Sequence, residues 1–125
     1  MSYLNPLKNT WDAYMKLWAQ HDEVLRLKQI EQCLNPACMY VDPDAQISGH
    51  VFICDYISEF HKNSPGRVFV TQDFTFHHSR SLAHWDLLNS EGKFLSHGAS
   101  FALYDTDGRV MQMTDFFDPP LDSSP

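Results

Sequence analysis

An aspartate directly follows an apolar stretch of the chain, because residues 38–42 read Cys-Met-Tyr-Val-Asp and lead into Pro43. Burial in an apolar cavity raises the pKa of a carboxyl group and makes it a better base at neutral pH. If residues 38–41 form a buried strand, Asp42 lies at its end, at the lip of such a cavity. A turn that Asp42 caps together with Asp44 is the alternative.

A second carboxylate, Asp115, lies in the alternating stretch 109–117 and is predicted to face the same cavity. Two carboxylates that face one cavity repel each other, so one of them keeps a proton near neutral pH. Such a pair is suited to acid/base chemistry. The alternative is an ion pair between Asp115 and Arg80 or Arg109 at the rim.

Two hydroxyl groups could act beside these carboxylates. Tyr14 shares a helical stripe with Trp11 and Trp18, and a buried phenol needs a partner, which could be Asp42 or a ligand oxygen. Ser100 lies on the cavity face of a predicted strand. A position in the ordinary hydrophobic core is the alternative for Tyr14.

The elements that must position these residues are three helices followed by four sequential strands, which predicts an α+β fold with an antiparallel meander. Thr10, Asp22 and Ser48-Gly49 are predicted to begin the helices, and a short strand over 38–41 precedes the third. The long strands are expected near 68–77, 81–88, 94–104 and 109–117. One domain is expected over 1–125, with its core in 10–117, an arm over 1–9 and a flexible tail over 118–125.

Small residues on one face of the third long strand predict a cavity. Its even-numbered positions 94–102 read Phe, Ser, Gly, Ser, Ala, and small side chains on a concave face leave space. Adjacent strand residues point to opposite faces, so only one of His77 and His78 can face the cavity. The alternation places His78 near the mouth of the cavity, and an ordinary surface position is the alternative for this histidine. The predicted ligand-binding residues are Trp18, Tyr40, Phe60, Gln72, His78, Trp85, Met113 and Phe117.

The opposite face of the sheet then carries an apolar patch that is too large to stay exposed in a monomer. A homodimer in which the two sheets pack against each other is therefore expected. The residues assigned to this outer face are Leu95, Phe101, Leu103, Val110 and Phe116. The inverted assignment, with the odd-numbered residues of 94–104 forming the core, remains open.

The composition argues against several classes of partner. A formal net charge of −7, from sixteen acids and nine Lys and Arg, disfavours nucleic acid. No apolar run approaches the roughly 18 residues of a spanning helix, and neither a basic amphipathic helix nor a signal peptide is evident. Three cysteines without a Cys-x-x-Cys pair favour a reducing compartment, so a cytoplasmic protein without a bound metal is expected.

The order and spacing of several short motifs resemble a SnoaL-like member of the nuclear transport factor 2-like superfamily, over about residues 10–117. The motifs are AQHD at the end of the first helix, YVDP followed by Gly49, SPG before the sheet, the Trp85 strand, GASF before YDTDGRV, and the closing DFF. This resemblance implies three N-terminal helices packed in the concave face of a strongly curved, mostly antiparallel sheet, a cystatin-like cone.

The resemblance also implies roles for individual residues. Ketosteroid isomerase has a general-base aspartate before proline at the end of its first strand, which Asp42 matches, and a tyrosine donor that Tyr14 matches more loosely. The isomerase's protonated aspartic acid falls close to Ser100, and a serine cannot act as a neutral acid, which argues against steroid isomerisation. SnoaL-type cyclases and scytalone dehydratase resemble the chain more loosely.

Three functions are carried as hypotheses. The first is a cofactor-free isomerase, cyclase or dehydratase that uses Asp42 as general base, with Tyr14 or Ser100 as hydrogen-bond donor and Asp115 as second carboxylate. The second is a protein that binds a small, largely apolar molecule without turnover. The third is a dimeric accessory or interaction subunit.

Overall fold

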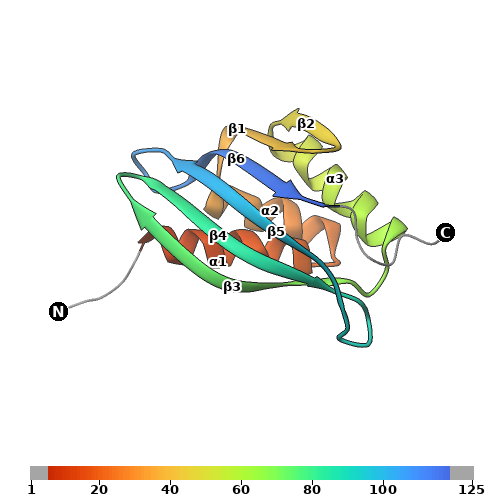
Figure 1. Ribbon diagram of the computed structural model, residues 1–125. Coiled ribbons are helices and arrows are strands. Elements are labelled where there is room, and N and C mark those ends of the chain that lie inside the picture. The colour runs from red at the N-terminus through yellow and green to blue at the C-terminus, as the bar shows by residue number, and fades with distance from the viewer. Residues whose placement is uncertain (1–5, 119–125) are drawn as a thin grey trace.

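A computed structural model describes residues 6–118 and shows three helices against one face of a six-stranded sheet (Figure 1). The predicted α+β class is confirmed. The helices are α1 (Pro6–Ala19), α2 (Glu23–Cys33) and α3 (His50–Asn63). The strands are β1 (Leu34–Asp42), β2 (Ala45–Ser48), β3 (Val68–His77), β4 (Arg80–Leu88), β5 (Phe94–Tyr104) and β6 (Val110–Phe117). The tail predicted over 118–125 lies, apart from residue 118, outside the described residues, as do residues 1–5 of the predicted arm.

The strands follow the order β2-β1-β6-β5-β4-β3, which includes the predicted antiparallel meander β3–β6. β1 is longer than the expected 38–41, and it pairs in parallel with β6 and antiparallel with the unpredicted β2. In the β1–β6 register Val41 lies opposite Thr114. The ends of these two strands, which carry Asp42 and Asp115, therefore lie side by side.

The helix boundaries agree with the sequence at two starts and differ at one. Asp22 caps α2, since its Oδ1 accepts hydrogen bonds from the backbone N–H of Val24 (2.9 Å) and Leu25 (3.1 Å), and Gly49 precedes α3 with φ +89°. The predicted start at Thr10 is wrong. α1 begins at Pro6, where a proline lacks only an N–H that the first helical turn leaves unbonded, so residues 6–9 are helical.

The apolar spacing of Val24, Leu27 and Ile30 predicts that these residues form the buried face of α2, and this is only partly correct. Val24 and Leu27 are 67% and 42% exposed, whereas Arg26 is buried. The Arg26 guanidinium donates to the carbonyl oxygens of Gln20 and Cys54 and to the Ser58 hydroxyl. These bonds satisfy the end of α1 and join α2 to α3, which explains why a charged side chain takes the inner face.

The face assignment of the sheet is confirmed along most of its length. Positions 96, 98, 100, 102 and 104 of β5 are buried, and so are Ala83, Trp85 and Leu87 of β4. Two positions of β6 contradict it, because Val110 is buried and Met111 is 47% exposed. The β5–β6 pairing shifts register between Leu103 and Tyr104, and such an irregularity changes which residues of the strand face the core. Leu95 is likewise buried beside a register shift in the β4–β5 pairing.

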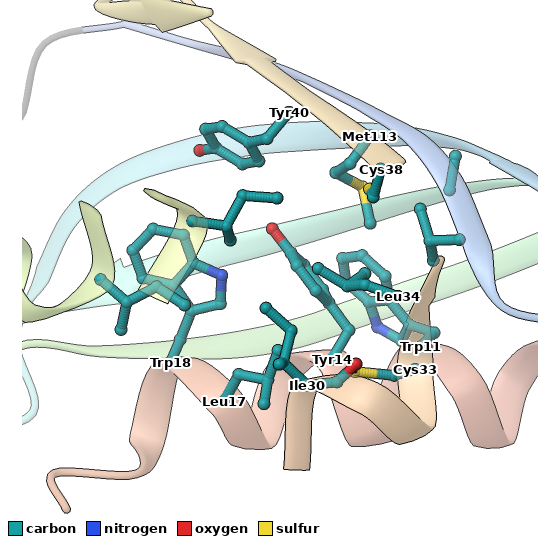
Figure 2. Packing of buried hydrophobic residues seen from close by; sticks show 14 of the residues in the cluster. Trp11, Tyr14, Leu17, Trp18, Ile30, Cys33, Leu34, Cys38, Tyr40 and Met113 are labelled. Atoms are coloured by element: carbon teal, nitrogen blue, oxygen red, sulfur yellow. The ribbon is translucent and has the colours of Figure 1, made fainter. Parts of the chain in front are cut away.

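The core lies between the helices and the sheet (Figure 2). Trp11 and Leu17 of α1 and Ile30 of α2 are fully buried there, and the Trp11 indole N–H donates to Thr71 Oγ1 at 3.0 Å. Tyr14 rises from α1 towards the strands that carry Tyr40 and Met113, so its hydroxyl reaches the sheet side of the core.

Candidate functional site

A cavity of about 300 Å³ lies between α1, α3 and the sheet. Its walls are mostly aromatic, with Tyr14, Trp18, Tyr40, Tyr56, Phe60, Phe69, Trp85 and Phe117, together with Met15 and Leu87. Its inner polar residues are Asp42, Ser96, Ser100 and Asp115. Exposed Asp44, Glu59, Asn63 and Asp118, with half-buried Ser64 and Arg67, form a polar rim. An apolar chamber with a few convergent polar groups is typical of small-molecule sites.

Asp42 ends β1 and is only 8% exposed, and both of its carboxylate oxygens are engaged. Oδ2 accepts hydrogen bonds from the hydroxyls of Tyr40 and Tyr56, each at 2.7 Å, and Oδ1 accepts from the backbone N–H of Asp44 at 2.8 Å. The last bond closes the turn that the sequence offered as the alternative. Asp42 therefore caps a turn and lines the cavity at once.

Asp115 lies opposite Ser100 in the β5–β6 pairing and is 8% exposed. Its Oδ2 accepts from the Tyr40 hydroxyl at 3.2 Å, whereas its buried Oδ1 has no partner within residues 6–118. Burial raises the pKa of this carboxyl to about 7, and the nearby charge of Asp42 adds to the rise, while the hydroxyls of Ser100 and Tyr40 oppose it. Asp115 can thus gain or lose a proton near neutral pH.

The two arginines considered as alternative partners of Asp115 bind elsewhere. Arg80 donates to the carbonyl oxygen of His78, and Arg109 pairs with Asp105 at 4.0 Å and donates to the carbonyl oxygen of Glu31. The Tyr40 hydroxyl instead lies between the two carboxylates, with its oxygen 2.7 Å from Asp42 Oδ2 and 3.2 Å from Asp115 Oδ2. The two aspartates joined in this way through Tyr40 are called the carboxylate pair.

The predicted hydroxyl groups also reach the cavity. The Tyr14 hydroxyl is buried without a hydrogen-bond partner in the described part of the chain, and burial, followed by the charge of Asp115, raises its pKa well above the ordinary value. Ser100 Oγ accepts from the indole N–H of Trp85 at 2.9 Å. Gly98 makes this possible, because a Cβ at that position would lie 2.3 Å from Trp85 Cη2.

Five of the predicted ligand-binding residues line the cavity, namely Trp18, Tyr40, Phe60, Trp85 and Phe117. Met113 is fully buried in the core and is not among the lining residues. It points inwards as predicted, yet neighbouring side chains separate it from the open space.

Gln72 and His78 lie away from the cavity, so their predicted positions are corrected. The β3–β4 pairing shifts register between Thr71 and Asp73, which turns Gln72 to the outer face, where its side-chain amide donates to Asp86 at 3.1 Å. His78 is exposed in the turn between β3 and β4, where it and Ser79 have φ of 47° and 59°. This turn is at the end of the sheet away from the C-terminal end of α3, which carries Asn63 of the rim (Figure 1).

Sequence reasoning missed Tyr56 and Phe69 as cavity residues. Tyr56 shares the inner face of α3 with Ile53 and Phe60, so helical spacing placed the residue correctly, but only the contact with Asp42 reveals a role for the hydroxyl. Within residues 6–118 no group of three or more His, Cys, Asp or Glu side chains is arranged to hold a metal ion. None of the helices described is long and apolar enough to span a membrane.

No family model matches the sequence, and no curated protein matches it. Several solved structures, in contrast, match the fold of this chain. A candidate isomerase of the SnoaL-like family from Agrobacterium tumefaciens superposes with a TM-score of 0.86 at 23% identity, over 92% of this chain and 99% of that one. An NTF2-like protein of unknown function from Cytophaga hutchinsonii gives 0.70 at 12% identity, over 95% and 96%.

A candidate SnoaL-like polyketide cyclase from Jannaschia sp. CCS1 gives a TM-score of 0.69 at 11% identity, over 94% of this chain and 92% of that one. At such low identities the likeness concerns the fold, since one fold hosts many functions. These matches agree with the helix order and the mixed sheet of this protein. The chain therefore has the fold of the SnoaL-like and NTF2-like proteins, as its motifs indicated.

Proposed function

We propose that the protein is a cofactor-independent acid/base enzyme of the isomerase, cyclase or dehydratase type, acting on a small, largely apolar molecule. The observation that carries this proposal is Asp115. Its carboxyl lines an aromatic cavity, burial raises its pKa to about 7, and one of its oxygens has no partner within residues 6–118. A general acid or base works best when its pKa lies near the working pH. The names of two structural relatives, a candidate isomerase and a candidate cyclase, are compatible with this class.

The hydrogen bonds favour different roles for the two aspartates. Asp42, expected from the resemblance to be the base, already accepts three hydrogen bonds, which occupy three of the about four acceptor sites of its carboxylate. We assign proton transfer to Asp115 Oδ1 and assign Asp42 the task of holding Tyr40 and Tyr56. The unpartnered Tyr14 hydroxyl would then contact a polar atom of the substrate.

Proton exchange tests the proposal without knowledge of the natural substrate. In D2O the protein is incubated with cyclohexanone, 2-tetralone and N-methyl-4-piperidone, and loss of the α-protons is followed by NMR. The wild type should exchange at least one compound at least about 100-fold faster than Asp115→Asn does, the low end of general acid/base contributions. Asp107→Asn, in an exposed turn, is the matched control. Equal rates for the wild type and Asp115→Asn would refute the assignment and favour ligand binding without turnover.

The outer sheet face supports the expected homodimer, which is part of this proposal. Val70, Leu82 and Phe116 are 40%, 41% and 65% exposed there, an arrangement that a second copy would cover. Light scattering at micromolar concentration should give twice the monomer mass, and Phe116→Asp should halve it. The three cysteines are buried free thiols, compatible with the expected reducing, cytoplasmic compartment.

A further inference from the structure

The charged groups around the cavity are nearly all negative. Asp42 and Asp115 lie inside it, and Asp44, Glu59 and Asp118 surround its mouth. Arg67, at the rim, is the single Lys or Arg among the lining residues of the described chain. Clefts lined by one sign of charge attract ligands of the opposite sign and repel ligands of the same sign.

The cavity wall is a connected series of aromatic rings. The centroids of Tyr40 and Tyr56 are 5.5 Å apart, those of Trp18 and Phe60 5.4 Å, and those of Phe69 and Trp85 5.1 Å. Trp18 joins the first pair to the others, at 6.3 Å from Tyr56 and 5.5 Å from Phe69. Aromatic faces carry partial negative charge and attract ammonium groups, most strongly where water is excluded.

The polar hydrogens inside the cavity are largely engaged by the protein itself. The Tyr40 and Tyr56 hydroxyls donate to Asp42, and the Trp85 indole donates to Ser100. An anionic ligand would find no positive group in the interior and would lie next to two carboxylates, at a large desolvation cost. Among the residues of 6–118 that line the cavity, the buried side-chain polar atoms without a partner are Asp115 Oδ1, which only accepts when ionised, and the Tyr14 hydroxyl, which can also accept.

We infer that the cavity recognises a small organic cation, an ammonium group carried on an apolar body, with the charge between the carboxylate pair and the rings of Trp18, Tyr40 and Tyr56. The apolar body lies against Phe60, Phe69 and Trp85. This inference rests on the proposed function only in placing the substrate in this cavity, and it names the substrate's chemical class. A volume of about 300 Å³ suits a small ligand of one or two rings or a short chain.

A series of matched ligands tests the charge preference directly. The probes are 3-phenylpropylammonium, 3-phenylpropan-1-ol and 3-phenylpropanoate, which share one apolar body, and binding at pH 8 is followed by the fluorescence of Trp18 and Trp85, which line the cavity. The ammonium should bind at least about tenfold more tightly than the alcohol, and the alcohol more tightly than the carboxylate. Equal or weaker binding of the ammonium, or no binding of it at all, would overturn the inference.

Variants locate the charge that is responsible. Asp115→Asn should reduce ammonium affinity at least about fivefold and change alcohol affinity less than twofold. If this variant does not fold, Glu59→Gln, on the exposed rim, replaces it in the test. Its affinity for the ammonium should fall twofold to threefold, and its affinity for the alcohol should not change. Asp107→Asn should change neither affinity. An ammonium preference that survives both cavity variants would also refute the inference.

The two proposals fail separately. Exchange of α-protons that depends on Asp115, together with a preference for the alcohol, would leave the acid/base function standing and refute the cation class. Tight ammonium binding that Asp115→Asn weakens, without any proton exchange, would support the cation class and refute catalysis.

Discussion

Replacing Asp115 with asparagine should change how the stability of the protein depends on pH. The ordinary pKa of this carboxyl, 3.8, applies to the unfolded chain, and in the folded chain burial raises it to about 7. Between these values the unfolded chain releases a proton that the folded chain retains, so the folded state binds more protons. Wild-type stability should therefore fall as the pH rises from about 4 to about 7, and this loss should level off above 7.

The size of the effect can be worked out from the same two values. One pKa unit corresponds to about 1.4 kcal/mol, so a rise from 3.8 to about 7 amounts to about 4 kcal/mol in the free energy of unfolding. Asp115 is 8% exposed, so solvent screening reduces this figure little. Asparagine has nearly the same shape and does not titrate. Relative to its own stability at pH 4, Asp115→Asn should therefore lose about 4 kcal/mol less than the wild type by pH 8.

Urea unfolding followed by tryptophan fluorescence, at half-unit steps from pH 4 to pH 9, measures this difference. Groups other than Asp115 titrate in both proteins, so the difference between the two curves isolates the one carboxyl. Asp107 is an exposed aspartate in a turn, so the curve of unfolding free energy against pH for Asp107→Asn should run parallel to the wild-type curve. Parallel curves for Asp115→Asn and the wild type between pH 4 and 7 would show that Asp115 ionises normally, and the proposed proton carrier would be lost.

Gly98→Ala should lower the free energy of unfolding by about 2 kcal/mol or more and alter indole fluorescence, because the new methyl group would displace the Trp85 ring. Unchanged fluorescence and stability would contradict this packing. Tyr56→Phe removes one of the three donors to Asp42 and should cost about 1–2 kcal/mol in urea unfolding, whereas no loss would mean that the bond is weak or absent in solution. Asp22→Ala removes the cap of α2 and should cost about 1 kcal/mol, with a loss below about 0.3 kcal/mol counting against the cap.

The elements that could be read from the sequence are those that depend on near neighbours. The change from helical to alternating periodicity after Gly66 and the caps at Asp22 and Gly49 are local signals, and the structure confirms them. The parallel pairing of β1 with β6 joins residues more than 70 positions apart, and a short apolar run around 38–41 does not specify its partner. That pairing brings Asp42 beside Asp115, so the sequence predicted that the two carboxylates share a cavity but not which strand pairing brings them together.

Irregular backbone explains the residues whose face or position was predicted wrongly. Gln72 and Met111 each lie at a register shift, where the strand's alternation changes phase, and neither position carries a glycine that would have marked it. His78 and Ser79 form a tight turn with positive φ, a conformation usually signalled by Asn or Gly. Alternation alone therefore predicted the correct face for Asp115 and the wrong one for Gln72.

Two features that lower the stability of the fold, buried polar atoms without partners and an open volume, occur together at the cavity, which favours a binding role for it. Trp11, Leu17 and Ile30 are fully buried in the core, with the Trp11 indole hydrogen-bonded. Beside them Asp115 and the Tyr14 hydroxyl each bury a polar atom that has no partner within residues 6–118, around a cavity of about 300 Å³. Apolar residues that filled this space would stabilise the protein, since unpaired buried polar atoms and cavities both cost free energy. Two of the three buried side-chain polar atoms that lack a partner within residues 6–118 thus belong to residues that line the cavity, as a ligand-binding centre requires.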